Sequence, residues 1–226
     1  YRDAQDECKR AKQKLISFLL CQGFVWNEKT SKGTLKGTFT RDWWRWVGTI
    51  NFEEDSANET LAYYVRRVKE AQAEAQQMKA LIEQAAQEQR HAPYVDALCC
   101  LKGVSTTSAF AARTEFADFT RFSSGRKVSC WMGTTPSNNS SGEKEAHGHI
   151  TKAGNSYMRR TLVEGVSTIG TWKKPSKVKE HSGSVSAAVE AMAADANARL
   201  LCRYKHLVGD NHLHPNKAKV AVVSEL

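Results

Sequence analysis

The chain has 226 residues, 41% of them hydrophobic and 25% charged, which is the composition of an ordinary soluble globular protein with one large or two modest domains. It contains no apolar run of about eighteen residues, so the sequence predicts no membrane-spanning helix. The net charge of +9 favours a partner with a phosphate backbone, although solubility alone would also account for a modest positive charge.

Six cysteines stand at positions 8, 21, 99, 100, 130 and 202, and none forms a Cys-x-x-Cys pair. This pattern predicts reduced, mostly buried thiols in a cytoplasmic protein. His147 and His149 have no Cys or His pair at the spacing of a zinc site, so no metal site is predicted in this chain. The sequence starts without a Met or a signal peptide, and we expect it to be a piece of a longer protein.

Two helices are expected near the start of the chain. Residues 2–22 carry acids early, bases in the middle and apolar residues late, and Gly23 is a suitable stop. Residues 27–40 are rich in Lys, Thr, Ser and Gly without an apolar period, which predicts an exposed loop. The Trp-rich segment 41–46 either begins an amphipathic helix that packs its indoles inward, which we favour, or stacks its indoles on nucleic-acid bases.

A long helix is expected over about residues 56–90. Its apolar positions step by three or four, at Leu61, Val65, Val68, Ala71, Ala75, Met78, Ile82 and Ala85. Sustained for more than three heptads, this spacing is typical of a coiled coil, and its Ala-rich seam indicates helix packing or dimerisation rather than a catalytic surface. Pro93 is expected to end this helix.

After Tyr94 the pattern is helix, Gly-containing turn, helix, with the turn at Gly103 and Ser105. Such a hairpin can point backbone N–H groups and a helix N-terminus at a DNA phosphate, but the same pattern also serves as plain αα-hairpin packing. Further helices are expected at 126–132, at 155–170 and at 184–208, with a turn near residues 212–214 before a last apolar stretch. Almost nothing in the sequence indicates a sheet.

The segment 138–142 reads Asn-Asn-Ser-Ser-Gly and places two hydroxyl groups, Ser140 and Ser141, before a cationic stretch. No Gly-x-Ser-x-Gly elbow is present, so acyl chemistry is not supported. Glycine lets a phosphate approach the backbone, and Lys152, Arg159 and Arg160 carry charge that suits phosphodiester chemistry. A solvated Ser-rich loop explains the same residues without catalysis. No acidic cluster stands out that would hold a catalytic metal.

The motifs that carry a family resemblance are Leu101-x-Gly103-Val104, Ser140-Ser141-Gly142, Gly148-x-Ile150-Thr151-Lys152-x-Gly154-Asn155-x-x-x-Arg159-Arg160-x-Leu162 and Arg199-Leu200-x-x-Arg203-Tyr204. They resemble the "one-ten" insertion-sequence transposases, the recombinases related to the pilin-gene DNA invertase. The resemblance covers nearly the whole chain, and the block 122–162 is its most specific part.

The resemblance implies an N-terminal RuvC-like domain with a DEDD acidic quartet, then a coiled coil, then a transposase domain with a nucleophilic serine. It implies a covalent phosphoserine–DNA intermediate, Mg²⁺ held by the acidic domain, a homo-oligomer (dimer or tetramer) and, in some members, a structured guide RNA. The nucleophile is carried over to Ser141, directly before Gly142, with Ser140 as the nearest competitor. We expect this chain to begin after the RuvC-like domain and to be inactive alone.

The sequence therefore predicts an all-α protein, with a helical coiled-coil region at 1–93 and a transposase domain at 94–226 that includes a helix-hairpin-helix-like element. The predicted DNA- or phosphate-binding residues are Lys152, Asn155, Arg159, Arg160, Gly103 and Ser105. Two alternatives remain: a non-catalytic nucleic-acid-binding and oligomerisation module that uses Gly103, the Trp-rich segment and the lysines of 173–179, and a purely structural coiled-coil protein.

Overall fold

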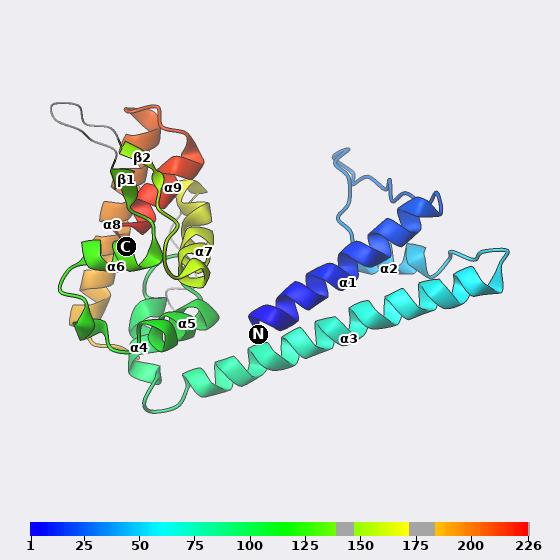
Figure 1. Cartoon of the computed structure of the whole chain (residues 1–226), viewed down its shortest axis with the longest axis horizontal. Coiled ribbons are helices and arrows are strands. Elements are labelled where there is room, and N and C mark those ends of the chain that lie inside the picture. The colour runs from blue at the N-terminus through cyan, green and yellow to red at the C-terminus, as the bar shows by residue number, and fades with distance from the viewer. Residues whose placement is uncertain (139–146, 172–183, 226) are drawn as a thin grey trace. The chain divides into compact units, whose positions relative to one another are not determined.

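A computed structural model of the chain describes residues 1–138, 147–171 and 184–225 (Figure 1). The described residues are mostly helical, as predicted, and contain one small antiparallel sheet. The chain divides into two compact units, Tyr1–Leu81 and Ile82–Leu226, each of which is described by itself below. The predicted domain boundary was at 93/94. None of the described helices has the length and apolar content needed to cross a membrane.

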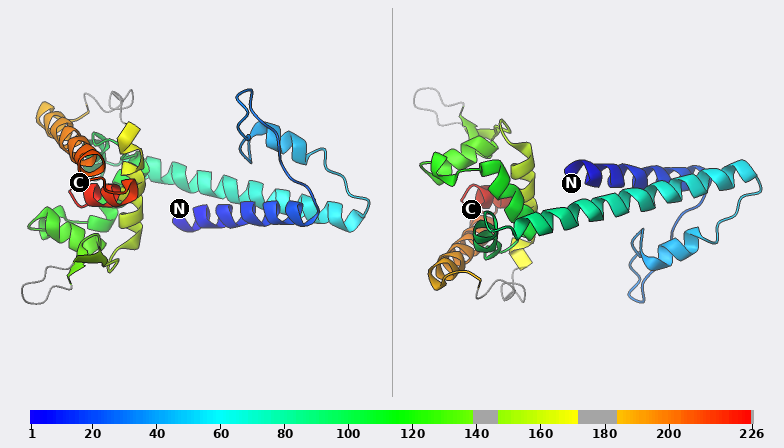
Figure 2. Two further views of the ribbon diagram at one scale, coloured as in Figure 1. Left: turned by 90° about the horizontal axis from the view of Figure 1, so that it is seen from above. Right: turned by 90° about the horizontal axis from the view of Figure 1, so that it is seen from below.

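The first unit contains α1 (Arg2–Cys21), α2 (Arg41–Val47) and most of α3 (Asp55–Ala86). Within this unit α1 and α3 run side by side (Figures 1 and 2), and an ion pair of 3.7 Å joins Arg67 to Glu7. The shared core takes residues from all three helices, namely Ala11, Leu15, Leu19, Trp43, Val47, Leu61, Val68 and Ala71. The end of the first helix near Gly23 is confirmed.

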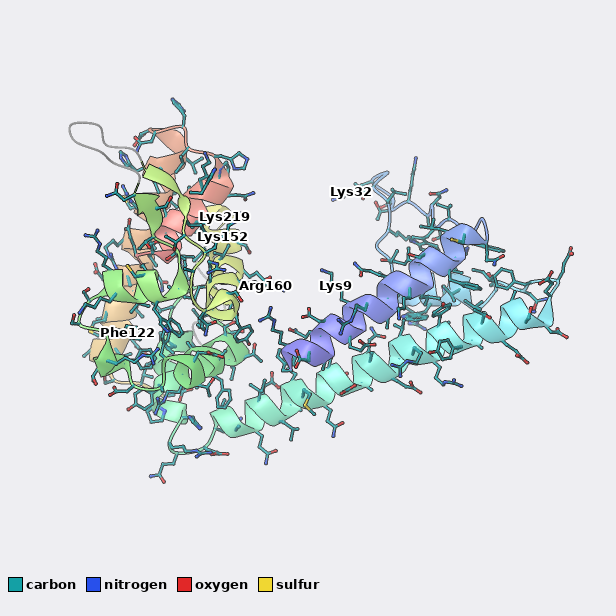
Figure 3. All side chains as sticks on the ribbon, viewed as in Figure 1. Lys9, Lys32, Phe122, Lys152, Arg160 and Lys219 are labelled. Carbon is teal, nitrogen blue, oxygen red and sulfur yellow. The ribbon has the colours of Figure 1, made fainter. Side chains whose placement is uncertain are left out.

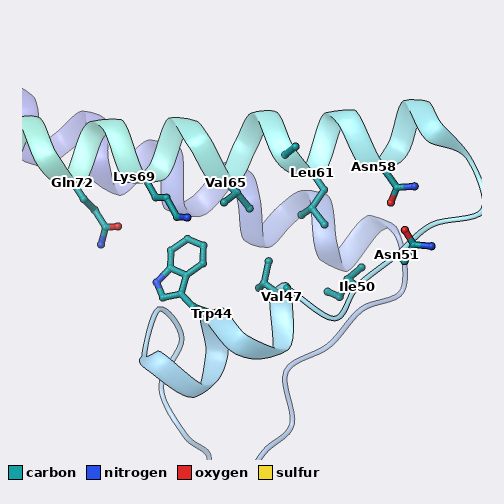
Figure 4. Close-up of a pocket in the computed structure, with 11 residues that line it drawn as sticks. Trp44, Val47, Ile50, Asn51, Asn58, Leu61, Val65, Lys69 and Gln72 are labelled. Carbon is teal, nitrogen blue, oxygen red and sulfur yellow. The ribbon is translucent and has the colours of Figure 1, made fainter.

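The Trp-rich segment packs inward, as predicted. It forms α2, whose N-cap Thr40 accepts a hydrogen bond from the Trp43 N–H, and Trp43 is only 1% exposed. Trp44 is partly buried and lines a pocket of about 540 Å³ between α2 and α3, where the Lys69 ammonium lies 5.9 Å from its ring centroid (Figure 4). These indoles therefore serve the core of the first unit, and Trp43 has no face free for a base.

The long helix α3 is confirmed, but its predicted end is wrong. It ends at Ala86, and Pro93 lies in the first turn of the next helix, α4 (Ala92–Cys99). Proline is favoured in a first turn because its φ angle suits the helix and its missing N–H would have had no partner there. The early part of the apolar stripe packs within the first unit, so coiled-coil pairing and dimerisation remain predictions.

The second unit is built from helices around a main core and a smaller cluster of Ala86, Val95, Cys99 and Ala109. After α4 its elements are α5 (Thr106–Phe116), η1 (Phe119–Arg121), α6 (Gly125–Met132), β1 (Pro136–Asn138), β2 (His147–Ile150), α7 (Ser156–Gly165), η2 (Val166–Thr171), α8 (Ala187–Gly209) and α9 (Pro215–Val223). The core brings together Met132 of α6, Met158 of α7, Leu200 of α8 and Val222 of α9, each at most 2% exposed. The last two helices therefore complete a core that earlier elements begin.

Two further differences from the prediction concern the end of α7 and the sheet. Regular α-helix stops at Gly165 and continues to Thr171 as a 3₁₀ helix, whereas one helix to about 170 was expected. The strands β1 and β2 pair antiparallel, with Pro136 opposite Ile150 and Asn138 opposite His147. Strands of three and four residues are too short to give a readable alternation of apolar and polar residues.

Candidate nucleic-acid site

The predicted nucleophiles Ser140 and Ser141 lie outside the described residues. They belong to the segment that joins Asn138, the last residue of β1, to His147, the first residue of β2. The structure therefore describes the two strands on either side of the serines and the elements to which those strands are fastened.

The chain entering and leaving these strands is fixed by backbone hydrogen bonds. Beyond the strands, the Thr151 N–H donates to the Thr135 carbonyl at 2.9 Å, and the Lys152 N–H donates to the Gly133 carbonyl at 3.0 Å. Gly154 has φ +112°, and a Cβ there would stand 2.0 Å from the Trp131 carbonyl oxygen. Only glycine permits this approach, so segment 151–155 lies directly against the end of α6.

Asn155 has a structural role at the start of α7. Its Oδ1 accepts a hydrogen bond from the Met158 N–H at 2.9 Å, and its Nδ2 donates to Glu115 Oε2 of α5 at 2.6 Å. The first bond caps the helix, and the second fixes which way the amide points. Glu115 thus links α5 to the segment that follows β2.

The three predicted cations of this region have different surroundings. Lys152 is exposed and has a positive φ of 56°, which is uncommon for a residue with a side chain. Arg159 is partly buried, and its Nη1 donates to the Met132 carbonyl at the end of α6 at 2.6 Å. Arg160 is exposed and pairs with Glu164 at 2.8 Å; Figure 3 labels it together with Lys152. Arg159 thus helps to hold α7 on α6, while Lys152 and Arg160 face solvent.

The turn between α4 and α5 is where Gly103 and Ser105 lie. Gly103 has φ +84°, and a Cβ there would stand 1.9 Å from the Gly165 carbonyl oxygen at the end of α7. Ser105 caps α5 by accepting a hydrogen bond from the Ser108 N–H at 3.3 Å. Two helices joined by a turn are present, and both the helix-hairpin-helix-like element and its contact with a DNA phosphate stay predictions.

The same turn is held from α8 by Asn197, a polar side chain only 7% exposed. Its Oδ1 accepts from the Lys102 N–H at 2.8 Å, and its Nδ2 donates to the Cys100 carbonyl at 3.1 Å. Sequence reasoning missed both Asn197 and Glu115, because their partners lie about 95 and 40 residues away along the chain. No local pattern signals contacts of that range.

Across residues 1–138, 147–171 and 184–225, no group of three or more His, Cys, Asp or Glu side chains is placed to hold a metal ion. The described acids therefore do not form a catalytic Mg²⁺ site by themselves.

Burial raises the pKa of the Cys99 thiol to about 11, so this group stays protonated at neutral pH.

This region is similar to known transposases. Residues 95–182 match the model of the Transposase IS116/IS110/IS902 family. A Sinorhizobium fredii protein whose name describes it as a transposase is 36% identical over 120 residues, which cover 51% of this chain and 30% of that protein. A Pseudomonas aeruginosa protein named as a family 20 transposase is 29% identical over 75 residues, covering 33% and 22%.

The matched stretches span less than a third of either relative's own length. The family match includes the serine segment, β1, β2, α7, α5 and the part of α4 from Val95 onward. The family resemblance predicted from the motifs is thereby confirmed at the level of the domain: residues 95–182 are similar to the transposase domain of the IS116/IS110/IS902 family.

Proposed function

We propose that this chain takes part in DNA transposition, cutting and joining DNA through the hydroxyl group of Ser141. The observation that carries the proposal is the transposase-family match over residues 95–182, which contains both Ser140 and Ser141. The backbone hydrogen bonds that hold the segment after β2 against the end of α6 support the proposal. A nucleophile must be held in place relative to the groups around a phosphate.

The proposed step is a transesterification. The Ser141 oxygen attacks the scissile phosphorus, the bond from phosphorus to one deoxyribose oxygen breaks, and a phosphoserine ester forms. The serine proton passes to a base, and the departing deoxyribose oxygen takes up a proton. Attack by another deoxyribose hydroxyl reverses the exchange and restores the serine, so joining needs no external energy source.

The nearby cations have distinct proposed roles. Lys152, exposed beside the strand ends, would offset the charge that builds on the phosphate oxygens. Arg160 would exchange its partner Glu164 for a phosphate, whereas Arg159 and Asn155 would act mainly by keeping α7 in place. Gly103 and Ser105 would bring the N-terminus of α5 to the DNA backbone further along.

The proposal also includes three properties that the family resemblance implies. The protein would depend on Mg²⁺ held by a RuvC-like domain, would be directed by a guide RNA, and would assemble as two or four copies. Bound Mg²⁺ would stabilise charge on the phosphate and on the oxygens that attack and leave it. The described acids form no cluster that would hold the ion, so its ligands would come from the RuvC-like domain.

The test is a covalent adduct. The chain is incubated with labelled DNA, Mg²⁺, a RuvC-like domain of the same family and its RNA, and a denaturing gel is searched for a band that protease removes. We expect a band that is lost in Ser141→Ala and with EDTA, and that persists in Ser140→Ala. A band that survives Ser141→Ala contradicts the assignment. Salt-sensitive DNA binding without any band would favour the non-catalytic binding module.

A further inference from the structure

A second feature of the second unit is an aromatic–arginine surface, formed by the exposed Tyr94, Phe119 and Arg121 and the partly buried Arg113, Phe122 and Trp131. These residues come from α4, α5, η1 and α6 and from the turn that follows η1. Tyr94 is 47% exposed and Phe119 is 36% exposed, which is unusual for large apolar side chains.

The two exposed rings are almost parallel. The ring centroids of Tyr94 and Phe119 are 6.4 Å apart and their planes differ by 12°. Two stacking steps of about 3.4 Å each require about 6.8 Å, slightly more than this centroid separation. Phe119 also contacts the buried ring of Phe116 at 5.4 Å, so it is supported from below rather than free to collapse onto Tyr94.

Arginine side chains accompany the rings. The Arg113 guanidinium donates to the Ala117 carbonyl and lies 4.3 Å from the Tyr94 centroid, whereas the exposed Arg121 guanidinium lies 4.5 Å from the Phe122 centroid and 5.1 Å from the Trp131 centroid. Phe122 is labelled in Figure 3. Between residues 113 and 127 the chain carries four cations and two carboxylates, a net charge of +2.

Both carboxylates accept hydrogen bonds from neighbouring side chains or backbone groups. Glu115 accepts a hydrogen bond from Asn155, and Asp118 accepts from the N–H and hydroxyl of Thr120 at 2.8 and 2.7 Å. The surface therefore offers flat apolar faces together with guanidinium groups, and its acids are engaged locally. That combination suits a ligand with exposed π-faces and a negative backbone.

We propose that the aromatic–arginine surface binds single-stranded nucleic acid, with a base stacked against Tyr94 and Phe119 and the phosphates beside the exposed Arg121. In a duplex the bases already stack on one another, so a paired site would not use these rings. The shared chemistry fits either an RNA partner or a displaced DNA strand. The surface requires no covalent step, so its failure and that of the serine proposal are separate outcomes.

The experiment measures the affinity of the full chain for labelled oligothymidylate, oligouridylate and a duplex, each of about 16 nucleotides. Tyr94→Leu and Phe119→Leu should each weaken single-strand binding about fivefold or more, whereas Tyr94→Phe should keep it. Tyr63→Leu is the matched control, because Tyr63 is 48% exposed and has Arg66 over its ring at 5.7 Å. The helical circular dichroism spectrum of each variant establishes that it is folded.

Preference between the thymidylate and uridylate oligomers identifies the partner as DNA or RNA. Ultraviolet crosslinking of the bound oligomer, mapped by mass spectrometry, should place a crosslink at Tyr94 or Phe119. The proposal is overturned if folded Tyr94→Leu and Phe119→Leu bind single strands as the unmodified chain does. It is equally overturned if Tyr63→Leu loses as much affinity, or if the duplex loses affinity in parallel with the single strands.

Discussion

The contact between Gly103 and Gly165 gives a quantitative prediction. The substitution is Gly103→Ala, which adds one methyl group to the turn between α4 and α5. Gly103 has φ +84°, and the new Cβ would stand 1.9 Å from the Gly165 carbonyl oxygen and 2.6 Å from its carbonyl carbon. Both atoms belong to the backbone, so the clash cannot be relieved by rotating a side chain.

Two costs add. An alanine in the left-handed region costs about 1–2 kcal/mol. Moving packed backbone apart to admit the methyl group costs about 1–3 kcal/mol more. We therefore expect Gly103→Ala to lower the free energy of unfolding of the second unit by about 2–5 kcal/mol. Each kcal/mol shifts the melting midpoint of a domain of this size by about 2–4 °C.

Matched glycines separate the two costs. Gly165→Ala meets the Gly103 carbonyl oxygen at 2.8 Å without a positive φ, so only the contact cost applies. Gly209→Ala meets nothing within 4 Å and ends α8, so it should be neutral or slightly stabilising. Scanning calorimetry should rank the melting midpoints Gly103→Ala below Gly165→Ala below Gly209→Ala. Equal midpoints for Gly103→Ala and Gly209→Ala would refute the close backbone contact.

Two other predictions concern buried groups of the second unit. Asn197→Ala should lower the free energy of unfolding by about 2–4 kcal/mol, because it leaves the Lys102 N–H and the Cys100 carbonyl without their partner, and urea unfolding would measure it. A midpoint unchanged from that of the unmodified chain would mean that water replaces the amide. Iodoacetamide at pH 8 should label the exposed Cys202 well before Cys99, because burial raises the pKa of the Cys99 thiol to about 11. Mass spectrometry after timed quenching would measure the two labelling rates. Equal rates would contradict this prediction.

Local sequence patterns predicted most of the helices. The acid-to-base order and apolar spacing located α1, and the stripe beginning at Leu61 located α3. The helix expected at 126–132 is α6, and Gly133 follows its last residue in a left-handed conformation. The errors lie where local signals are weakest: Pro93 opens a helix rather than ending one, and two strands of three and four residues escaped notice.

The candidate site was predictable only as a set of residue types. The spacing after Gly148 drew attention to Lys152, Asn155 and Arg159, and these residues do follow β2 and begin α7. What sequence reasoning lacked was their partners. The hydrogen bonds of Asn155 to Glu115 and of Arg159 to the Met132 carbonyl join different helices, so only the folded chain assigns them a structural role.

Asn197 also has a consequence for the order of events during protein synthesis. Ribosomes add about 5–20 residues per second, so the amide that completes the α4–α5 turn is made about 5–20 s after Lys102. Val222 and Val223, which fill the core, come later still. The segment that matches the transposase family model, 95–182, is therefore translated before its folding partners, and the nascent chain must spend that interval with the turn unpaired and the core incomplete.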